Sequence, residues 1–179
     1  MRIISGKLGG RRITPPRKMP YTRPTTDVAK EGLFNMLEHG FPLDGCKTLD
    51  LFGGTGCISY ELASRGAENQ TLIEKDNKQV RFIKKTAGEL NIPLKVFKMD
   101  VFKFMERSKE QFDFIFAGPP YALKTIDQLP DLVFEYRLLN EDGWFVLEHT
   151  PDHNFDKHPY FDRKKNYGTT IFSIFILNK

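Results

Sequence analysis

The chain has 179 residues, of which 40% are hydrophobic and 28% are charged. This size and composition favour one folded domain with a packed core and argue against an intrinsically disordered protein. No apolar run approaches the roughly 18 residues of a membrane span, and the first residues, MRIISGKLGG, lack the apolar segment of a signal peptide. With only Cys46 and Cys57, and no C-x-x-C pair, we expect a protein of the reducing cytoplasm.

Positive charge is concentrated at the N-terminus. The net charge is +4 and the pI about 9.0. Residues 1–23 hold seven of the 27 basic residues and no acidic residue. The seven are Arg2, Lys7, Arg11, Arg12, Arg17, Lys18 and Arg23. A segment with charge of one sign attracts polyphosphate, so we expect it to contact nucleic acid, although a solvated basic tail would have the same composition.

The first 40 residues predict an extension followed by a helix. MRIIS and RRIT lie on either side of GKLGG and predict a short β-hairpin. The proline-rich residues 15–24 predict a linker without regular structure. Residues 25–40 predict a helix, because their apolar residues recur on one face and Thr26 or Asp27 can cap its start. We therefore divide the chain into a basic extension, 1–24, and a main domain, 25–179.

From residue 47 onward, the patterns of strand and helix alternate. Strands are predicted at 47–52, 70–75, 94–99, 112–117 and 143–149, and helices at 57–66, 76–91, 100–108 and 125–139. Residues 160–178 predict two antiparallel strands around a Tyr-Gly turn. Such alternation is typical of a parallel sheet covered on both faces. The expected fold class is α/β, a doubly wound, mostly parallel seven-stranded Rossmann-like sheet with an antiparallel C-terminal hairpin and a small N-terminal β-hairpin.

The first strand ends in LDLFGGTG, a glycine-rich turn. Ligands of doubly wound sheets bind beyond the carboxyl ends of the strands, and Gly53, Gly54 and Gly56 would let the backbone approach one closely. The third glycine of the dinucleotide fingerprint is missing, and Asp50 suits a cofactor that carries its own ammonium group. S-adenosylmethionine has an ammonium, a carboxylate, a sulfonium and a ribose diol. We therefore expect this turn to bind S-adenosylmethionine.

Two further acidic residues end the neighbouring strands. Glu74 could accept hydrogen bonds from both ribose hydroxyls, and Asp100 could accept one from the adenine amine. Glu74 could equally be a solvated acid, and Asp100 could cap the helix that follows. The cofactor interpretation gains weight because all these residues fall on the same edge of the predicted sheet.

The fourth strand ends in FIFAGPPYALK. Two consecutive prolines, Pro119 and Pro120, force an extended backbone, which fixes the carbonyls of residues 118 and 119. Tyr121 adds an aromatic face. Rigid acceptors beside an aromatic ring suit the exocyclic amine of a nucleobase, a poor nucleophile that has to be positioned for reaction. The base would have to leave its stack to enter.

The motifs DLFGGTG, IEKD and GPPY, in this order, resemble those of class I S-adenosylmethionine-dependent methyltransferases that act on amino groups. MRIISGKLGGRRITPP, RPTTDVAKEGLFNML and YGTTIF are similar to the RsmD-like bacterial 16S rRNA (guanine-N2)-methyltransferases, so the resemblance covers nearly the whole chain. It implies methyl transfer to the N2 amine of a guanine in 16S rRNA, within the small ribosomal subunit or its assembly intermediate. We expect a monomer without a metal.

The resemblance also implies roles for individual residues. Those expected to contact the cofactor are Thr25, Thr26, Asp50, Phe52, Gly53, Gly54, Gly56, Glu74, Lys75, Asp100 and Val101. The expected catalytic pocket for the target base consists of Gly118, Pro119, Pro120 and Tyr121. The residues expected to bind RNA are Lys7, Arg11, Arg12, Arg17, Lys18 and Arg23.

Gly118 departs from the family pattern, which places an acidic or amide side chain there to accept a proton of the amine. Losing one preorganised hydrogen bond at a reacting centre costs roughly 10²–10³ in rate. A water molecule or a nearby carboxylate could replace the missing acceptor, or the chain could be impaired. We expect cofactor binding to persist and methyl transfer to be weakened.

Other interpretations remain open. The chain could methylate amino groups of DNA or of another RNA, or it could be a non-catalytic relative that binds S-adenosylmethionine and RNA. A protein substrate is disfavoured by the basic extension, and a nicotinamide-dependent dehydrogenase is a distant alternative. His149, His153 and His158 match no metal-ligand spacing, so we expect a polar loop there. Trp144 is expected to pack in the core.

Overall fold

The computed structural model describes residues 1–16 and 25–178. Its strands are β1 (Lys47–Asp50), β2 (Glu68–Glu74), β3 (Lys95–Lys98), β4 (Phe112–Ala117), β5 (Leu139–His149), β6 (Phe161–Tyr167) and β7 (Thr170–Phe175). Its helices are α1 (Asp27–Gly40), α2 (Cys57–Ser64), α3 (Asn77–Glu89), α4 (Val101–Arg107), the short 3-10 helix η1 (Ile126–Gln128) and α5 (Leu129–Glu135).

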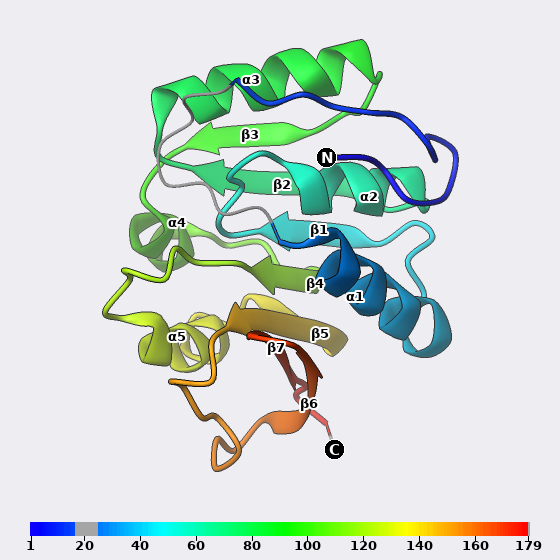
Figure 1. Ribbon diagram of the computed structural model, residues 1–179. Helices are drawn as coiled ribbons and strands as arrows, with labels where there is room; N and C mark the ends of the chain where they lie inside the picture. The colour runs from blue at the N-terminus through cyan, green and yellow to red at the C-terminus, as the bar shows by residue number, and fades with distance from the viewer. Residues whose placement is uncertain (17–24, 179) are drawn as a thin grey trace.

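The seven strands form one sheet in the order β3-β2-β1-β4-β5-β7-β6 (Figure 1). Strands β1 to β5 are parallel to one another, whereas β7 is antiparallel to β5 and to β6. The strand order reverses direction between β1 and β4, which is where ligands of doubly wound sheets bind. The predicted fold class, including its antiparallel C-terminal hairpin, is confirmed.

Helices cover both faces of the sheet because the central strands are buried on both sides. On one face, Leu33 and Phe34 of α1 pack with Phe116 of β4. On the other face, Met105 of α4 and Val133 of α5 share a cluster with other residues of β4 and β5. Strand β4 is buried at five of its six positions, as the run FDFIFA predicts for a central parallel strand.

Helix starts follow their capping residues. The Thr26 side chain accepts a hydrogen bond from the Ala29 amide at 3.2 Å and so caps α1, as predicted. Asp76 caps α3 by accepting from the amides of Lys78 and Gln79 at 2.8 and 3.0 Å. These caps fix where each strand-to-helix connection turns, and hence where the strand-end side chains lie.

The predicted helix 125–139 is too long. It consists of η1 followed by α5, which ends at Glu135. Pro130 lies in the first turn of α5, where a helix has no use for the missing amide, so it starts the helix instead of disturbing it. Arg137 then takes a left-handed conformation with φ 53°, and β5 begins at Leu139, earlier than the predicted 143.

The described part of the N-terminal extension forms the predicted hairpin in minimal form. Arg2 and Arg12 make one antiparallel bridge, and the amide of Ile3 donates to the carbonyl of Arg11 at 2.9 Å. Ile3 is 1% exposed and packs with Tyr60 of α2 in a separate apolar cluster. The hairpin is therefore attached to the main domain through a small core of its own. The rest of the predicted linker, residues 17–24, lies outside the described residues.

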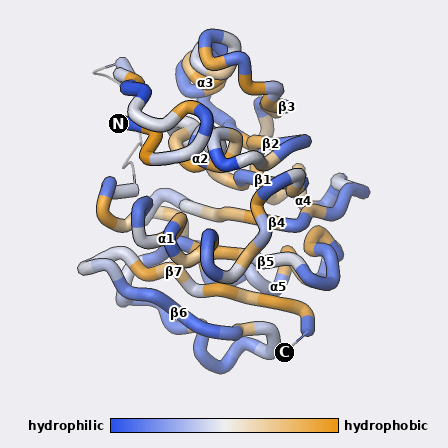
Figure 2. The backbone as a smooth tube through the Cα atoms, turned by 90° about the vertical axis from the view of Figure 1, so that its right-hand side faces the viewer, coloured by the Kyte–Doolittle hydropathy of each residue, from blue (hydrophilic) through white to orange (hydrophobic). Residues whose placement is uncertain are grey.

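The edge strand at the C-terminal side of the sheet is polar. Strand β7 is hydrophobic and buried, whereas the edge strand β6 is hydrophilic (Figure 2). Lys164 and Lys165 lie on β6, and charged residues on an edge strand disfavour pairing with another sheet. Trp144 of β5 packs against Phe41 with ring centroids 5.4 Å apart, as the sequence predicts. Within the described residues, no helix is both long and apolar enough to cross a membrane.

If the hairpin is part of the folded core, Ile3→Ala will destabilise the protein by about 2–5 kcal/mol, because it removes a fully buried side chain. Urea unfolding followed by circular dichroism measures this. The exposed Lys7→Ala in the same hairpin is the control and should change the free energy of unfolding by less than about 0.5 kcal/mol. Equal unfolding midpoints for the two variants would contradict the docked arrangement.

Candidate functional site

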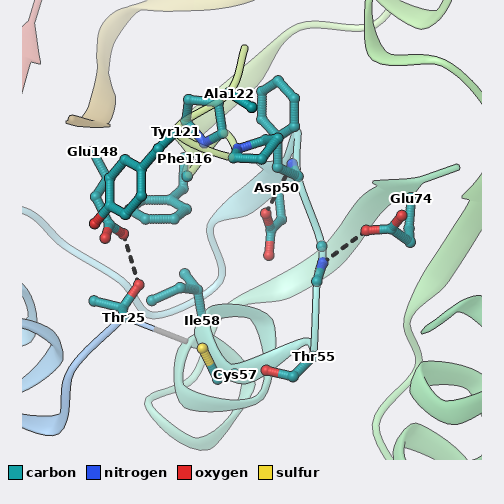
Figure 3. Close-up of a pocket in the computed structure, with 16 residues that line it drawn as sticks. Thr25, Asp50, Thr55, Cys57, Ile58, Glu74, Phe116, Tyr121, Ala122 and Glu148 are labelled. Atoms are coloured by element: carbon teal, nitrogen blue, oxygen red, sulfur yellow. Dashed lines mark hydrogen bonds between the residues drawn. The ribbon is translucent and has the colours of Figure 1, made fainter. Parts of the chain in front are cut away.

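A cavity of about 430 Å³ opens at the carboxyl ends of the central strands (Figure 3). Its walls include the turn after β1, the end of β2, the Pro-Pro-Tyr turn after β4 and the end of β5. Ten of the predicted site residues line it, namely Thr25, Asp50, Phe52, Gly53, Gly54, Glu74, Gly118, Pro119, Pro120 and Tyr121. The structure thus brings the two motifs singled out in the sequence to opposite sides of one cavity.

The glycine turn comes close to the neighbouring strand. The Gly53 amide donates to the carbonyl of Ile73 at 2.9 Å, and a Cβ atom at position 53 would lie 2.3 Å from Leu72 Cδ2. Gly54 has φ 55°, in the left-handed region that favours glycine. Both glycines are therefore required by the path of the backbone, which lines the cavity at these two positions.

Glu74 at the end of β2 holds this turn in place. One carboxylate oxygen accepts from the Gly54 amide at 2.9 Å and the other accepts from the Asp76 amide at 2.8 Å. A carboxylate has about four lone-pair sites, so these two bonds leave capacity for the ribose hydroxyls. Glu74 is therefore not simply a solvated acid. It fixes the loop that a ligand would touch, and it could also bind the ligand itself.

Asp50 is a deeply buried carboxyl group of the cavity. It is 2% exposed, and it accepts from the Ser59 hydroxyl at 3.1 Å and from the Phe52 amide at 3.3 Å. Burial raises the pKa of Asp50 to about 7, and the charges of Glu74 and Glu148 act in the same direction. The two hydrogen bonds oppose this shift without cancelling it. Asp50 is thus a buried carboxylate that gains from a nearby cation.

The Pro-Pro-Tyr turn forms the opposite wall. Pro119 is buried, and the carbonyl of Pro120 accepts from the Leu123 amide at 2.9 Å, which closes the turn. The Tyr121 side chain is 44% exposed, so an aromatic face stands at the rim of the cavity. A flat ring at the mouth and a rigid backbone behind it form a slot suited to a planar base.

Glu148, near the end of β5, is the main residue that sequence reasoning missed. Its carboxylate lines the cavity and accepts a hydrogen bond from the Thr25 hydroxyl at 2.6 Å (Figure 3). The signal was present in GWFVLEH, where an acid interrupts an apolar strand at its carboxyl end, as Asp50 and Glu74 do in β1 and β2. Thr55, Cys57, Ile58, Phe116 and Ala122 also line the cavity and were not predicted.

Five predicted cofactor residues do not line the cavity formed by the described part of the chain, namely Thr26, Gly56, Lys75, Asp100 and Val101. Asp100 caps α4 by accepting from the amides of Phe102 and Lys103 at 3.0 and 3.3 Å, which is the alternative weighed for it. Thr26 caps α1. Contact of these five residues with a cofactor stays a prediction.

The expectation of a polar histidine loop is wrong for His149. This side chain is 2% exposed at the end of β5, and its ring hydrogen-bonds the Ser173 hydroxyl at 2.8 Å. Burial lowers the pKa of His149. His153 and His158 pair with Asp127 and Asp131 at 2.9 and 3.2 Å. The described residues contain no group of three or more histidines, cysteines or acids placed to hold a metal ion.

Comparison with known proteins identifies the family. The protein-family model described as "Conserved hypothetical protein 95" matches residues 1–176. The chain belongs to this family. It is 33% identical to "Putative rRNA methyltransferase YlbH" of Bacillus subtilis strain 168 over 183 aligned positions, which cover 98% of each protein. It is 30% identical to "Ribosomal RNA small subunit methyltransferase D" of Buchnera aphidicola subsp. Acyrthosiphon pisum, with 82% of this chain and 76% of that protein covered.

The same relationship is seen in three dimensions. A solved structure of a hypothetical protein from Thermus thermophilus superposes with a TM-score of 0.86 at 28% identity and covers 99% of both chains. These matches confirm the RsmD-like family that the sequence resembles, and with it a class I methyltransferase fold.

The cavity of this family member fits S-adenosylmethionine. The described residues that line it include three carboxylates and no basic side chain, so it favours a ligand with positive charge. Asp50 would face the ammonium, and Glu74 the ribose. The backbone of the glycine turn lines the cavity at Gly53 and Gly54, where a ligand can approach it closely. Residues and cofactor therefore agree in charge and in shape.

The raised pKa of Asp50 makes cofactor affinity depend on pH. A bound ammonium favours the ionised carboxylate, so as pH falls below about 7 binding has to displace a proton. We expect the affinity for S-adenosylmethionine to fall by up to about tenfold per pH unit below that point. Isothermal titration at several pH values measures this.

Asp50→Asn should bind the cofactor more weakly and without this pH dependence. The control is Asp142→Asn, which removes an exposed carboxylate at the other end of β5 and should retain the wild-type profile. An affinity for the wild type that is flat from pH 6 to pH 8, roughly one unit on either side of the raised pKa, would contradict the role given to Asp50.

Proposed function

We propose that this S-adenosylmethionine-dependent rRNA methyltransferase acts on the exocyclic N2 amine of a guanine in small-subunit rRNA. The observation that carries the proposal is one cavity lined both by the glycine turn after β1 and by the Pro-Pro-Tyr turn after β4. A cofactor on the first turn and a base on the second would meet inside it. The name of the Buchnera relative, a small-subunit rRNA methyltransferase, supports the choice of substrate.

The residues of the cavity would act by positioning. When bound, S-adenosylmethionine supplies a methyl group made electrophilic by its sulfonium. Asp50 and the glycine turn hold one reactant, and Pro119 and Tyr121 hold the other. Because the amine of guanine is a poor nucleophile, alignment of its nitrogen with the methyl carbon supplies much of the acceleration. The base reaches this position by flipping out of its stack.

The N-terminal hairpin supports an RNA substrate. Arg2, Lys7, Arg11 and Arg12 are exposed on it, and residues 1–16 carry no acidic side chain. Arg17, Lys18 and Arg23, also expected to bind RNA, lie outside the described residues. We propose that residues 1–24 form the RNA-contacting extension. We also propose that the protein works as a cytoplasmic monomer on the small ribosomal subunit or its assembly intermediate.

The direct test is transfer of labelled methyl from S-adenosylmethionine to small ribosomal subunits that lack the modification. We expect the label in 16S rRNA and, after nuclease digestion and chromatography, in N2-methylguanosine. Large ribosomal subunits, double-stranded DNA and naked 16S rRNA are the comparison substrates. Label in methyladenosine or in DNA would support a different amino-methyltransferase. Binding of S-adenosylmethionine without transfer to any substrate would support a non-catalytic relative.

Removing charge from the hairpin should weaken RNA binding without affecting the cofactor. For the variant Arg11→Ala/Arg12→Ala we expect a higher KM for the subunit and an unchanged Kd for S-adenosylmethionine. The slope of log affinity against log salt should become shallower by about 2, because each lost phosphate contact removes about 0.9.

The matched control is Arg107→Ala/Lys109→Ala, which removes the same charge at exposed positions at and after the end of α4, on the other face of the sheet. It should leave the salt slope at the wild-type value. Equal effects of the two double variants would mean that only net charge matters, and would contradict a specific RNA contact by the hairpin.

A further inference from the structure

We propose that Glu148 accepts a hydrogen bond from the target amine and so replaces the side-chain acceptor that is missing at Gly118. The acidic group of the site would then stand at the end of β5 instead of at the end of β4. This inference rests on the proposed function, because it concerns the residue that holds the amine. It would also mean that Gly118 is no lesion and that the expected loss of rate does not occur.

Strand register places the two positions side by side. Strands β4 and β5 are parallel neighbours, and Ala117 pairs with Leu147. Gly118 and Glu148 are the next residues along each strand. Because side chains alternate between the two faces of a sheet, positions 118 and 148 lie on the same face as Phe116 and Val146, two residues earlier in each strand. Phe116 and Val146 belong to the apolar cluster under α1. Position 118 and Glu148 therefore face the same side at the same level of the cavity.

Distances show that Glu148 occupies the space next to residue 118. A Cβ atom at position 118 would lie 3.4 Å from Glu148 Oε2 and 3.0 Å from Phe116 Cε1. An aspartate there would press on the phenyl ring and set two carboxylates side by side, which disfavours ionisation of both. The site thus has room for one carboxylate. The absence of a side chain at position 118 therefore leaves the space that the Glu148 carboxylate occupies.

Contacts hold the Glu148 carboxylate in the cavity. The Thr25 hydroxyl donates to Oε2 at 2.6 Å, from the segment that leads into α1. Tyr121, the aromatic residue of the turn where the base is proposed to bind, lines the same cavity (Figure 3). An acceptor held in advance in this cavity needs little rearrangement to orient an amine.

The chemical step balances with Glu148 in this role. The amine nitrogen forms a bond to the methyl carbon, and the carbon–sulfur bond breaks with its electron pair staying on sulfur. The nitrogen gives up one proton, which the Glu148 carboxylate takes and passes to water. A hydrogen bond from the amine to this carboxylate before the reaction raises electron density on nitrogen and aligns it with the methyl group.

Four variants test the proposal by rate. Single-turnover methyl transfer to small subunits is measured together with the Kd for S-adenosylmethionine. For Glu148→Ala we expect a loss of roughly 10²–10³ in rate, with the Kd within about threefold of wild type. Gly118→Asp alone should also be slower, because its carboxylate would stand beside that of Glu148. In Gly118→Asp/Glu148→Ala this charge repulsion is absent, and we expect at least about tenfold recovery over Glu148→Ala. The matched control, Glu106→Gln at an exposed position of α4, should keep the wild-type rate.

A binding measurement tests the same contact without turnover. Inosine differs from guanosine only in lacking the 2-amino group. With protein saturated with S-adenosylhomocysteine, we expect guanosine to bind roughly tenfold tighter than inosine, as for one hydrogen bond to a charged group. Glu148→Ala should lose most of this preference and keep at most the part that the Pro119 carbonyl contributes. Gly118→Asp/Glu148→Ala should regain the preference.

The outcomes separate this proposal from the proposed function. A Glu148-dependent preference for guanosine supports the proposal even if the wild type methylates no ribosomal subunit, in which case only the substrate assignment fails. A rate for Glu148→Ala close to wild type, or a guanosine preference that is undiminished in this variant, overturns the proposal while the methyltransferase function stands. Glu148→Ala could also lose rate without rescue by Gly118→Asp while its guanosine preference stays intact. This result would show a purely structural role of Glu148 through Thr25, and it would also overturn the proposal.

Discussion

Parallel pairing of β1, β4 and β5 is the constraint on which the site depends. Three adjacent parallel strands end at the same edge of the sheet, so their last residues share one small volume. Asp50, Gly118 and Glu148 come together for this reason, although almost 100 residues separate the first from the last. The reversal of strand order between β1 and β4 leaves this edge open, and the loops that follow the strands form the cavity walls.

Close packing at that edge decides which residues can stand there. Gly53 has no space for a side chain beside Leu72, and Gly118 has little beside Phe116 and Glu148. Three carboxylates face one cavity, and their mutual repulsion adds to the burial that raises the pKa of Asp50. A cationic ligand relieves both costs. The same charges that make the empty cavity unfavourable thus make it selective for a cofactor with an ammonium and a sulfonium.

Much of the fold and part of the site could be predicted from the sequence. The run FDFIFA and the regular alternation of strands and helices predict a buried parallel sheet, and the caps at Thr26 and Asp100 follow from local chemistry. The boundary after α5 could not be predicted, because Pro130 starts a helix as readily as it breaks one. Glu148 was missed because its significance depends on the register of β5 against β4, a tertiary fact that no local pattern records.

The most direct test of these assignments is a crystal structure of the protein with S-adenosylhomocysteine and guanosine bound. We expect the cofactor product along the glycine turn, with its amino acid end toward Asp50. We expect the guanine ring against Tyr121, with its 2-amino nitrogen within hydrogen-bonding distance of the Glu148 carboxylate and the Pro119 carbonyl. Guanine bound with this amine directed away from Glu148, or bound outside the cavity, would contradict these assignments.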